Sequence, residues 1–218
     1  MAAAVVVPSA VVLRPNLPLT ARTVVVPTWY QRHGRTGPPD RVVLAYPVPS
    51  SGLQSSQVWQ ALDDMAWMQA SGGGPQGQAF RAGSASAGSA VLSAASLPLG
   101  PAPVPTPAAV AAVRYALARW GVTTVVVPDE PGLPRYIEGR GSAYAVGFFT
   151  AVLGSAPAFG DGAWVWEHVD HSPPGTPVPA AAFGRCTQDP ALAGPAAPTV
   201  ARSAVVRCVL AAAAPLGR

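Results

Sequence analysis

Apolar and polar positions follow different periods along this chain, and each period predicts a different element. The apolar run at 41–47 predicts a buried strand that stops at Pro47. Residues 57–69 repeat apolar side chains at helical spacing, which predicts a helix after Ser55 or Ser56. The expected core-facing stripe of this helix consists of Val58, Leu62 and Met65.

The middle of the chain predicts a long connection and then a helix followed by a strand. Residues 71–106 are rich in Gly, Ser, Ala and Pro, which favours a loop or linker with a short strand near 90–93. Thr106 and Pro107 are typical of a helix start, and Gly121 of a helix end. The β-branched run at 122–128 then predicts a buried strand.

The remaining pattern completes an α/β reading. Residues 128–141 form an expected loop, and residues 142–154 are apolar all round, which predicts a buried helix. The alternation at 163–169 predicts a strand with Trp164, Trp166 and His168 on one face and Val165, Glu167 and Val169 on the other. Residues 200–212 predict a further helix or strand. The predicted fold class is α/β, with a small mixed sheet of three to five strands, flanking helices and long Pro/Gly-rich loops.

The 218 residues suit one medium domain with tails. We expect a hydrophobic or juxtamembrane arm at 1–30, an α/β domain at 31–170 and an Ala/Pro-rich tail at 171–218. The uncharged run 1–13 is shorter than the roughly 20 residues that span a bilayer. It indicates either a hydrophobic arm or the last turns of a membrane helix, with Trp29 and Tyr30 suited to a membrane interface.

Composition excludes several kinds of chemistry. All 14 basic residues are arginine, so neither a Schiff-base lysine nor a phosphate-binding loop with its lysine is possible. The arginines are scattered, and we therefore expect no nucleic-acid partner. No cofactor is predicted.

Polar residues follow the ends of the predicted strands, where open α/β sheets bind ligands. The loops at 48–56, 71–80 and 129–140 hold Ser, Gln, Arg and carboxylate groups suited to sugar hydroxyls. A turn-forming sequence explains 128–132 equally well. The candidate ligand-binding residues are Ser50, Ser51, Gln54, Gln57, Asp129, Glu130 and Arg135, and no catalytic residue is identified.

Three other groups of polar residues are better explained by a structural role than by a functional one. Asp63 and Asp64 point about 100° apart on a helix, so two solvated helix acids are expected. On a strand, His168 and His171 face opposite sides, so no metal site is predicted. The stretch 49–56 does not match the G-x-S-x-G motif of serine hydrolases.

The two cysteines, Cys186 and Cys208, fit either two buried thiols or one disulfide. A disulfide requires an oxidising compartment, and it is the favoured reading if the protein lies outside the cytoplasm.

Four stretches together resemble one family. They are RPNLPLTARTVVVPTWY, RVVLAYPVPSSGLQSSQVWQALDDMAW, LARWGVTTVVVPD and DGAWVWEHV. This order resembles the C-terminal extracytoplasmic region of actinobacterial polytopic membrane proteins similar to glycosyltransferases that use lipid-linked sugar donors. The resemblance implies that residues 1–13 end a membrane helix and that 41–67 begin an appended α/β domain. The family's catalytic carboxylates lie between early membrane helices, so none maps onto this chain.

Three hypotheses follow. The first is a non-catalytic extracytoplasmic domain at the membrane face, which binds a glycan or the membrane-embedded part of the same system. The second is a stand-alone α/β enzyme, cytoplasmic in the alternative reading, that uses Asp129 and Glu130 or the serine loop 50–56. The third is an interaction module that docks partners through the Pro-rich segments 97–107 and 172–179.

Overall fold

A mixed β-sheet forms the centre of the part of the chain that the computed structural model describes, namely residues 25–38, 41–49, 55–70, 86–97, 100–129, 140–188 and 199–213. Within these residues the sheet has five strands in the order β2-β1-β3-β5-β4. β2, β1 and β3 are parallel, and β5 and β4 are antiparallel to their neighbours. The bounds are β1 Val42–Ala45, β2 Met68–Gln69, β3 Thr124–Pro128, β4 Ala158–Gly160 and β5 Ala163–Glu167.

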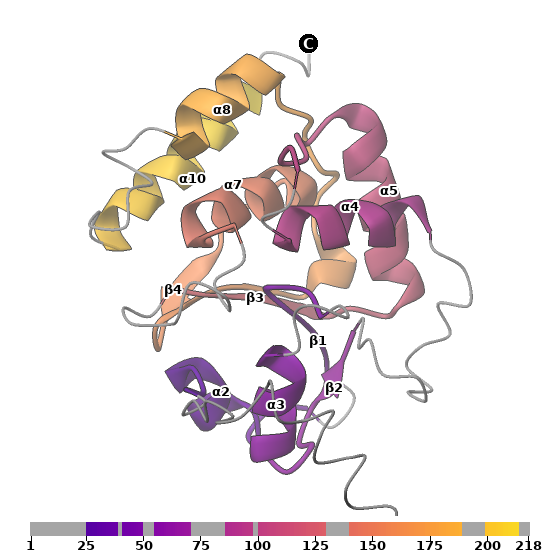
Figure 1. The fold of residues 1–218 in the computed structure, drawn as a ribbon, viewed down its shortest axis with the longest axis vertical. Helices are drawn as coiled ribbons and strands as arrows, with labels where there is room; N and C mark the ends of the chain where they lie inside the picture. The colour runs from indigo at the N-terminus through magenta and orange to yellow at the C-terminus, as the bar shows by residue number, and fades with distance from the viewer. Residues whose placement is uncertain are drawn as a thin grey trace, which may run out of the picture.

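Helices cover both faces of the sheet (Figure 1). One face is covered by α2 Thr28–His33 and α3 Ser55–Leu62. On the other side lie α4 Ala87–Ser96, α5 Pro107–Arg119 and α7 Ser142–Leu153, and α8 Ala180–Gln188 and α10 Thr199–Ala213 pack against the outer side of α7. A short 3-10 turn, η2 Val169–His171, follows β5. The predicted α/β class, with a small mixed sheet flanked by helices, is confirmed. None of the described helices is long and apolar enough to cross a membrane.

The strands are apolar on both faces because each face packs against a separate core. In β3, Val125 and Val127 point into the larger core beneath α5 and α7, whereas Val126 points into the smaller core beneath α2 and α3. In β5, Trp164 and Trp166 share the larger core, as the alternation predicts. The strand ends at Glu167, because His168 has a φ of 53° and starts the turn of η2, so the predicted faces of His168 and Val169 are wrong.

Two helices match their sequence signals closely. The Thr106 hydroxyl accepts a hydrogen bond from the Ala109 N–H (3.2 Å) and caps α5, and Gly121, with a φ of 66°, ends it. α7 is buried almost all round, as its uniform apolar character predicts. It fills the centre of the larger core and contacts α5, α8 and α10. α8 and α10 arise from the Ala/Pro-rich region 171–218.

The predicted helix over 57–69 is wrong in its extent and in its face. α3 ends at Leu62, because Asp64 and Met65 adopt left-handed φ values of 54° and 57° and turn the chain into β2. Trp59 faces the core, because Tyr30 of α2 supplies an aromatic partner with ring centroids 5.2 Å apart. The predicted core stripe of Val58, Leu62 and Met65 is exposed instead.

Two other stretches also differ from their predictions. The short strand expected near 90–93 is part of α4, where the Ser86 hydroxyl accepts from the Ser89 N–H (3.1 Å). Gly88 lies against α5 so closely that a Cβ there would stand 2.2 Å from the Ala112 carbonyl oxygen. Trp29 and Tyr30, expected at a membrane interface, are buried in the smaller core by α2.

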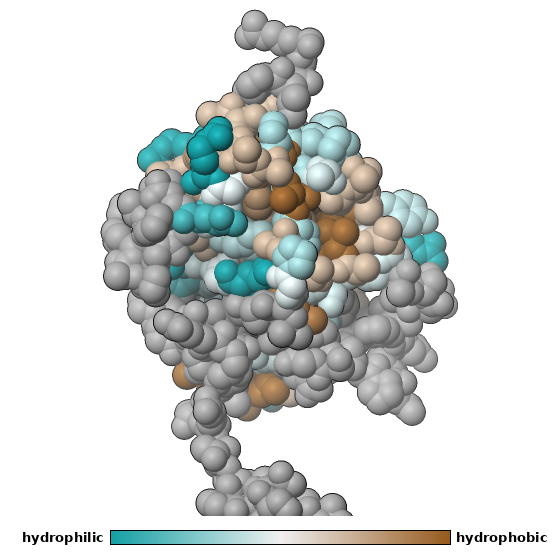
Figure 2. All heavy atoms as spheres, turned by 45° about the horizontal axis from the view of Figure 1, so that its top comes forward, coloured by the Kyte–Doolittle hydropathy of each residue, from teal (hydrophilic) through white to brown (hydrophobic). Residues whose placement is uncertain are grey.

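The surface over the larger core is mixed in character. Figure 2 turns the upper side of Figure 1 forward and shows small hydrophobic areas set among hydrophilic residues. The Pro-rich segments are partly bonded within the fold: the Val178 N–H donates to the Pro105 carbonyl (3.0 Å), and the Tyr144 hydroxyl donates to the Pro103 carbonyl (2.7 Å). Part of each segment is therefore used inside the fold.

Candidate ligand-binding edge of the sheet

The carboxyl ends of three parallel strands, β2, β1 and β3, meet at one edge of the sheet. The chain passes from β1 to β2 through α3 on one face, and then to β3 through α4 and α5 on the other (Figure 1). β1 and β3 are therefore neighbours whose connections leave in opposite directions. This arrangement is the topological switch point at which open α/β sheets bind ligands.

A polar cluster lies at this edge, where β3 ends. The Ser142 hydroxyl donates a hydrogen bond to Oδ1 of Asp129, and Nε of Arg202 lies 2.7 Å from the same oxygen. Arg202 Nε also donates to the Ser142 hydroxyl oxygen (2.7 Å). The Asp129 side chain is only 1% exposed, whereas that of Arg202 is 14% exposed. Asp129 directly follows β3, Ser142 begins α7 and Arg202 lies in α10, so the cluster joins three separate segments.

The polar cluster holds Asp129 as a fixed anion. Its carboxylate lies at the start of α7, where the helix dipole favours negative charge, and it is paired with a guanidinium. The Asp129 backbone N–H is used as well, because it donates to the Gly162 carbonyl (2.7 Å). Acting as a general base would require Asp129 to give up the pairing with Arg202, which is costly for a buried ion pair. The geometry therefore suits a positioning role for Asp129.

Replacement of Ser142 with alanine tests this cluster. The Arg202 Nε–H and the Asp129 carboxylate each lose one hydrogen-bond partner, so we expect the free energy of unfolding to fall by about 1–2 kcal/mol. Urea denaturation measures the change. Ser203→Ala, a half-buried serine on α10, is the matched control with an expected change of about 0.5 kcal/mol or less. Equal effects of the two substitutions would contradict the role given to Ser142.

The end of β1 is also fastened at this edge. The Tyr46 hydroxyl donates to the Ala95 carbonyl (3.3 Å) and accepts from the Arg140 backbone N–H (2.9 Å). Burial raises the pKa of Tyr46 well above its usual range, so the hydroxyl stays protonated as a donor. The Arg140 Nε–H donates to the Ala94 carbonyl (2.7 Å). The loop root before α7 is thereby bound both to β1 and to α4.

The structure places only some of the predicted site residues. Asp129 lies at the expected edge but is buried, and Gln57 lies partly buried in the first turn of α3. The other predicted residues, Ser50, Ser51, Gln54, Glu130 and Arg135, lie outside the described residues. Sequence reasoning missed Ser142 and Arg202. Arg202 is one of two arginines in the otherwise mostly apolar stretch 199–213, which is a weak signal, and the separation of 60 residues between Ser142 and Arg202 hides their contact.

No protein-family model, curated protein or solved structure matches this chain. The function is therefore inferred from the geometry and chemistry of the chain itself.

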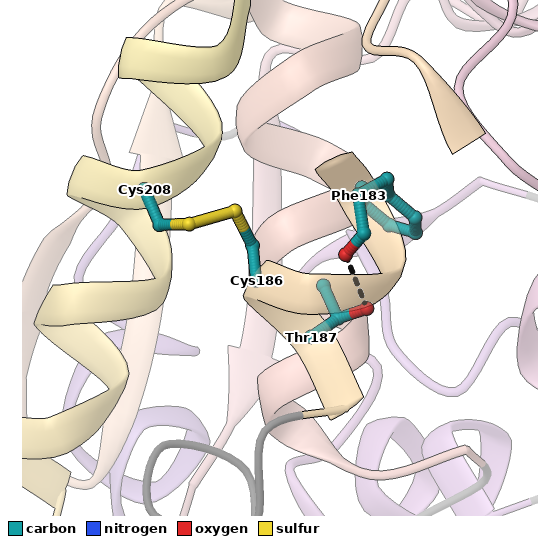
Figure 3. Close-up of a disulfide and its surroundings, with 4 residues drawn as sticks. All are labelled: Phe183, Cys186, Thr187 and Cys208. Atoms are coloured by element: carbon teal, nitrogen blue, oxygen red, sulfur yellow. Dashed lines mark hydrogen bonds between the residues drawn. A yellow bond between two sulfur atoms is a disulfide. The ribbon is translucent and has the colours of Figure 1, made fainter. Parts of the chain in front are cut away.

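A disulfide joins the helix of Arg202 to its neighbour. Cys186 of α8 and Cys208 of α10 are bonded, with Cα atoms 5.6 Å apart (Figure 3). The cysteine pair therefore forms a disulfide in the structure and does not remain as two buried thiols. In the same part of α8, the Thr187 hydroxyl donates to the Phe183 carbonyl (2.9 Å). The bond restrains α10. This helix carries Arg202, whose side chain lies at the sheet edge.

A second polar cluster lies away from this edge and links α2 to α3. Arg35 lies 3.0 Å from Asp63 and 2.5 Å from Asp64. The expectation of two solvated acids holds for Asp64, whose side chain is 77% exposed, and is wrong for Asp63, whose side chain is 6% exposed. Asp63 is buried because α3 ends there and the carboxylate turns toward α2.

A third cluster ties α2 to the β4–β5 turn. Nε2 of His33 lies 2.6 Å from Oδ2 of Asp161, and Arg32 donates to Oδ1 of the same carboxylate. The hydrogen bond with His33, and then the bond and charge of Arg32, lower the pKa of Asp161 below its usual 3.8. In the described part of the chain, no group of three or more His, Cys, Asp or Glu side chains is placed to hold a metal ion.

The lowered pKa of Asp161 predicts a specific pH dependence. Because the folded-state pKa lies below the unfolded-state value, the stabilisation is present above about pH 4 and is lost as the pH falls through the folded-state pKa. We expect the Asp161→Asn variant to have a lower Tm than the unmodified chain at pH 6. At pH 2.5 the Tm values of the two proteins should lie closer together. Thermal unfolding from pH 6 to pH 2.5 measures this difference. Parallel curves for the two proteins would contradict the assignment.

Proposed function

We propose that this chain is an extracytoplasmic glycan-binding accessory domain of a membrane glycosyltransferase-like protein, with no catalytic activity of its own. The observation that carries the proposal is the convergence of the carboxyl ends of β2, β1 and β3 at a switch point, beside the cluster of Asp129, Ser142 and Arg202. An edge of this kind is the usual ligand-binding position of open α/β sheets.

The chemistry of the edge suits sugar hydroxyls, which both donate and accept hydrogen bonds. Arg202, partly buried beside Asp129, carries a planar guanidinium of the kind that donates hydrogen bonds to hydroxyl oxygens. The chain segments that continue from these strands contain Ser50, Ser51, Gln54, Glu130 and Arg135, which supply both donors and acceptors. Neutral oligosaccharides are the proposed ligand class, because their hydroxyl groups can pair with arginine donors, with carboxylate acceptors and with serine and glutamine side chains.

The disulfide supports the proposed compartment. Bonds of this kind form and persist in oxidising environments outside the cytoplasm. The described residues contain no free cysteine, because both cysteines of the sequence are in the Cys186–Cys208 bond. The sequence resemblance to extracytoplasmic regions of membrane glycosyltransferase-like proteins points in the same direction.

The stand-alone enzyme is the weaker alternative on the described residues. Asp129, the described member of the predicted carboxylate pair, is buried and paired with Arg202. The interaction module has less support as well, because the Pro-rich segments bond to each other through Val178 and Pro105 and to α7 through Thr176 and Ala151. Neither alternative has an observation of its own that outweighs the sheet edge.

Titration of neutral oligosaccharides into the isolated chain tests the proposal. The probes are glucan, mannan, galactan and arabinan oligosaccharides, and calorimetry measures the Kd. We expect binding by at least one of them and a loss of about tenfold in affinity for Arg202→Gln, since one charge-assisted hydrogen bond is removed. Arg207→Gln is the matched control, because Arg207 is exposed on the same helix.

Three results would contradict the proposal. They are the absence of binding to every oligosaccharide class, equal affinities of the Arg202→Gln and Arg207→Gln variants, and turnover of sugar phosphates by the isolated chain. Circular dichroism of each variant shows whether the fold is kept, and Ser142→Ala is a second variant that perturbs the same cluster more mildly.

A further inference from the structure

An apolar stripe is exposed on α3 and the turn that follows it. We define the stripe as Val58, Leu62 and Met65, whose exposed fractions are 36%, 55% and 64%. Single exposed apolar residues are ordinary on protein surfaces, but several within one short element mark an interaction surface. Val58 and Leu62 are four residues apart and therefore lie on one face of the helix.

The helix end keeps Met65 beside the last turn of α3. The Met65 N–H donates to the Gln60 carbonyl (2.9 Å), which folds the turn back onto the last turn of α3. Met68, 47% exposed on the outer strand β2, and Val25, 42% exposed just before α2, are further exposed apolar residues of this region. α2 and α3 share one core cluster and lie together on the lower side of the sheet (Figure 1).

The opposite side of α3 is already used by the fold, so the stripe is not needed for the core. Trp59 is fully buried against Tyr30, and Ser56 is fully buried and accepts a hydrogen bond from Gln69 Nε2 (2.7 Å). α3 is thus apolar toward the sheet and apolar again toward the outside. A helix of this kind covers a core with one face and leaves the other for an external apolar surface.

We propose that the stripe docks on the surface of a lipid bilayer, with the α2–α3 side of the sheet nearest the membrane. This inference rests on the membrane-associated location of the proposed function, but not on glycan binding. The chain enters the described fold at Val25, on the side of the stripe. Residues 1–13 contain no charged side chain, and only residues 14–24 separate them from Val25. Eleven extended residues reach at most about 40 Å, so any membrane contact of the apolar segment keeps the domain near the lipid surface.

The charges beside the stripe favour apolar contact over attraction to anionic lipid. Arg32 is paired with Asp161, and Arg35 is paired with Asp63 and Asp64. These ion pairs leave little net positive charge on this side. Docking is therefore expected on neutral phosphatidylcholine vesicles, without a requirement for anionic lipid.

Vesicle flotation with oxidation mapping tests the proposal. The chain has three methionines, Met1, Met65 and Met68. Peroxide oxidation followed by peptide mapping therefore measures how accessible Met65 in the stripe, and Met68 in the neighbouring strand, are to solvent. With the full chain and phosphatidylcholine vesicles we expect co-flotation and a several-fold slower oxidation of Met65 and Met68. The double substitution Leu62→Gln with Met65→Gln should weaken partition into vesicles about tenfold. Tyr115→Gln is the matched control, because Tyr115 is 63% exposed on α5 across the sheet.

Several outcomes would overturn the proposal. They are the absence of co-flotation, co-flotation with unchanged oxidation of Met65 and Met68, equal losses for the double variant and Tyr115→Gln, and a dimer that protects the stripe without vesicles. The stripe variant is expected to bind oligosaccharides with unchanged affinity. Failure of membrane docking and failure of glycan binding are therefore observed in separate experiments.

Discussion

Replacement of Trp59 with alanine is expected to lower the free energy of unfolding by about 4 kcal/mol. The side chain is fully buried, and its ring stands 5.2 Å from that of Tyr30 between α2 and the sheet. Its Nε1 has no hydrogen-bond partner among the described residues, so the loss consists of apolar contacts and the cavity that remains. Urea denaturation followed by circular dichroism measures the change.

The adjacent residue supplies the control. Val58→Ala removes apolar atoms from the exposed side of the same helix, so we expect a change within about 0.5 kcal/mol. A large loss for Val58→Ala with a small loss for Trp59→Ala would mean that α3 packs in the orientation predicted from sequence. The stripe would then be part of the core, and the membrane-docking proposal would fail with it.

Reduction of the Cys186–Cys208 bond is expected to cost about 3 kcal/mol of folding free energy, because the bond closes a loop with a sequence separation of 22. For a chain of 218 residues this corresponds to a fall in Tm of roughly 6–12 °C. Thermal unfolding with and without reductant measures the effect, and thiol counting confirms that two thiols appear.

A double variant isolates the contribution of the bond. Cys186→Ser with Cys208→Ser should unfold near the temperature of the reduced chain and show no further response to reductant. An unchanged Tm after two thiols have appeared would contradict the stabilising role of the bond. The reduced chain is also expected to bind oligosaccharides more weakly, because α10 carries both Cys208 and Arg202.

The sequence predicts well those elements whose signals are local. The Thr106–Pro107 start and Gly121 end of α5, the apolar helix α7 and the β-branched strand β3 all lie where the pattern places them. In each case a few neighbouring residues contain the whole signal: a cap, a stop, or an unbroken apolar run.

Elements that depend on distant partners are harder to predict. α3 is apolar on two sides, so its pattern does not reveal which side meets the core, and the choice is made by Tyr30 and Trp67, which pack with Trp59. α4 is built mostly from Gly, Ala and Ser and resembles a loop in composition. Its small residues instead allow close packing on α5 at Gly88.

The residues of the candidate site also divide into those with a local sequence signal and those that depend on distant partners. Asp129 is predictable because it directly follows a strand whose end is clear in the sequence. Ser142 and Arg202 complete the cluster from α7 and α10, and only the tertiary fold brings α10, braced by the disulfide, to the end of β3. Burial of Asp63 likewise depends on Arg35, which is 28 residues away.

The most direct test of the central claim is to map oligosaccharide binding on the isolated, oxidised chain by amide chemical shifts in NMR spectra. Binding at the switch point predicts the largest shifts at the loop roots, namely Val48, Ala70, Asp129, Gly141 and Ser142, and small shifts for the stripe on α3. The largest shifts on the α2–α3 side, or no shifts with any of the four oligosaccharide classes, would contradict the account.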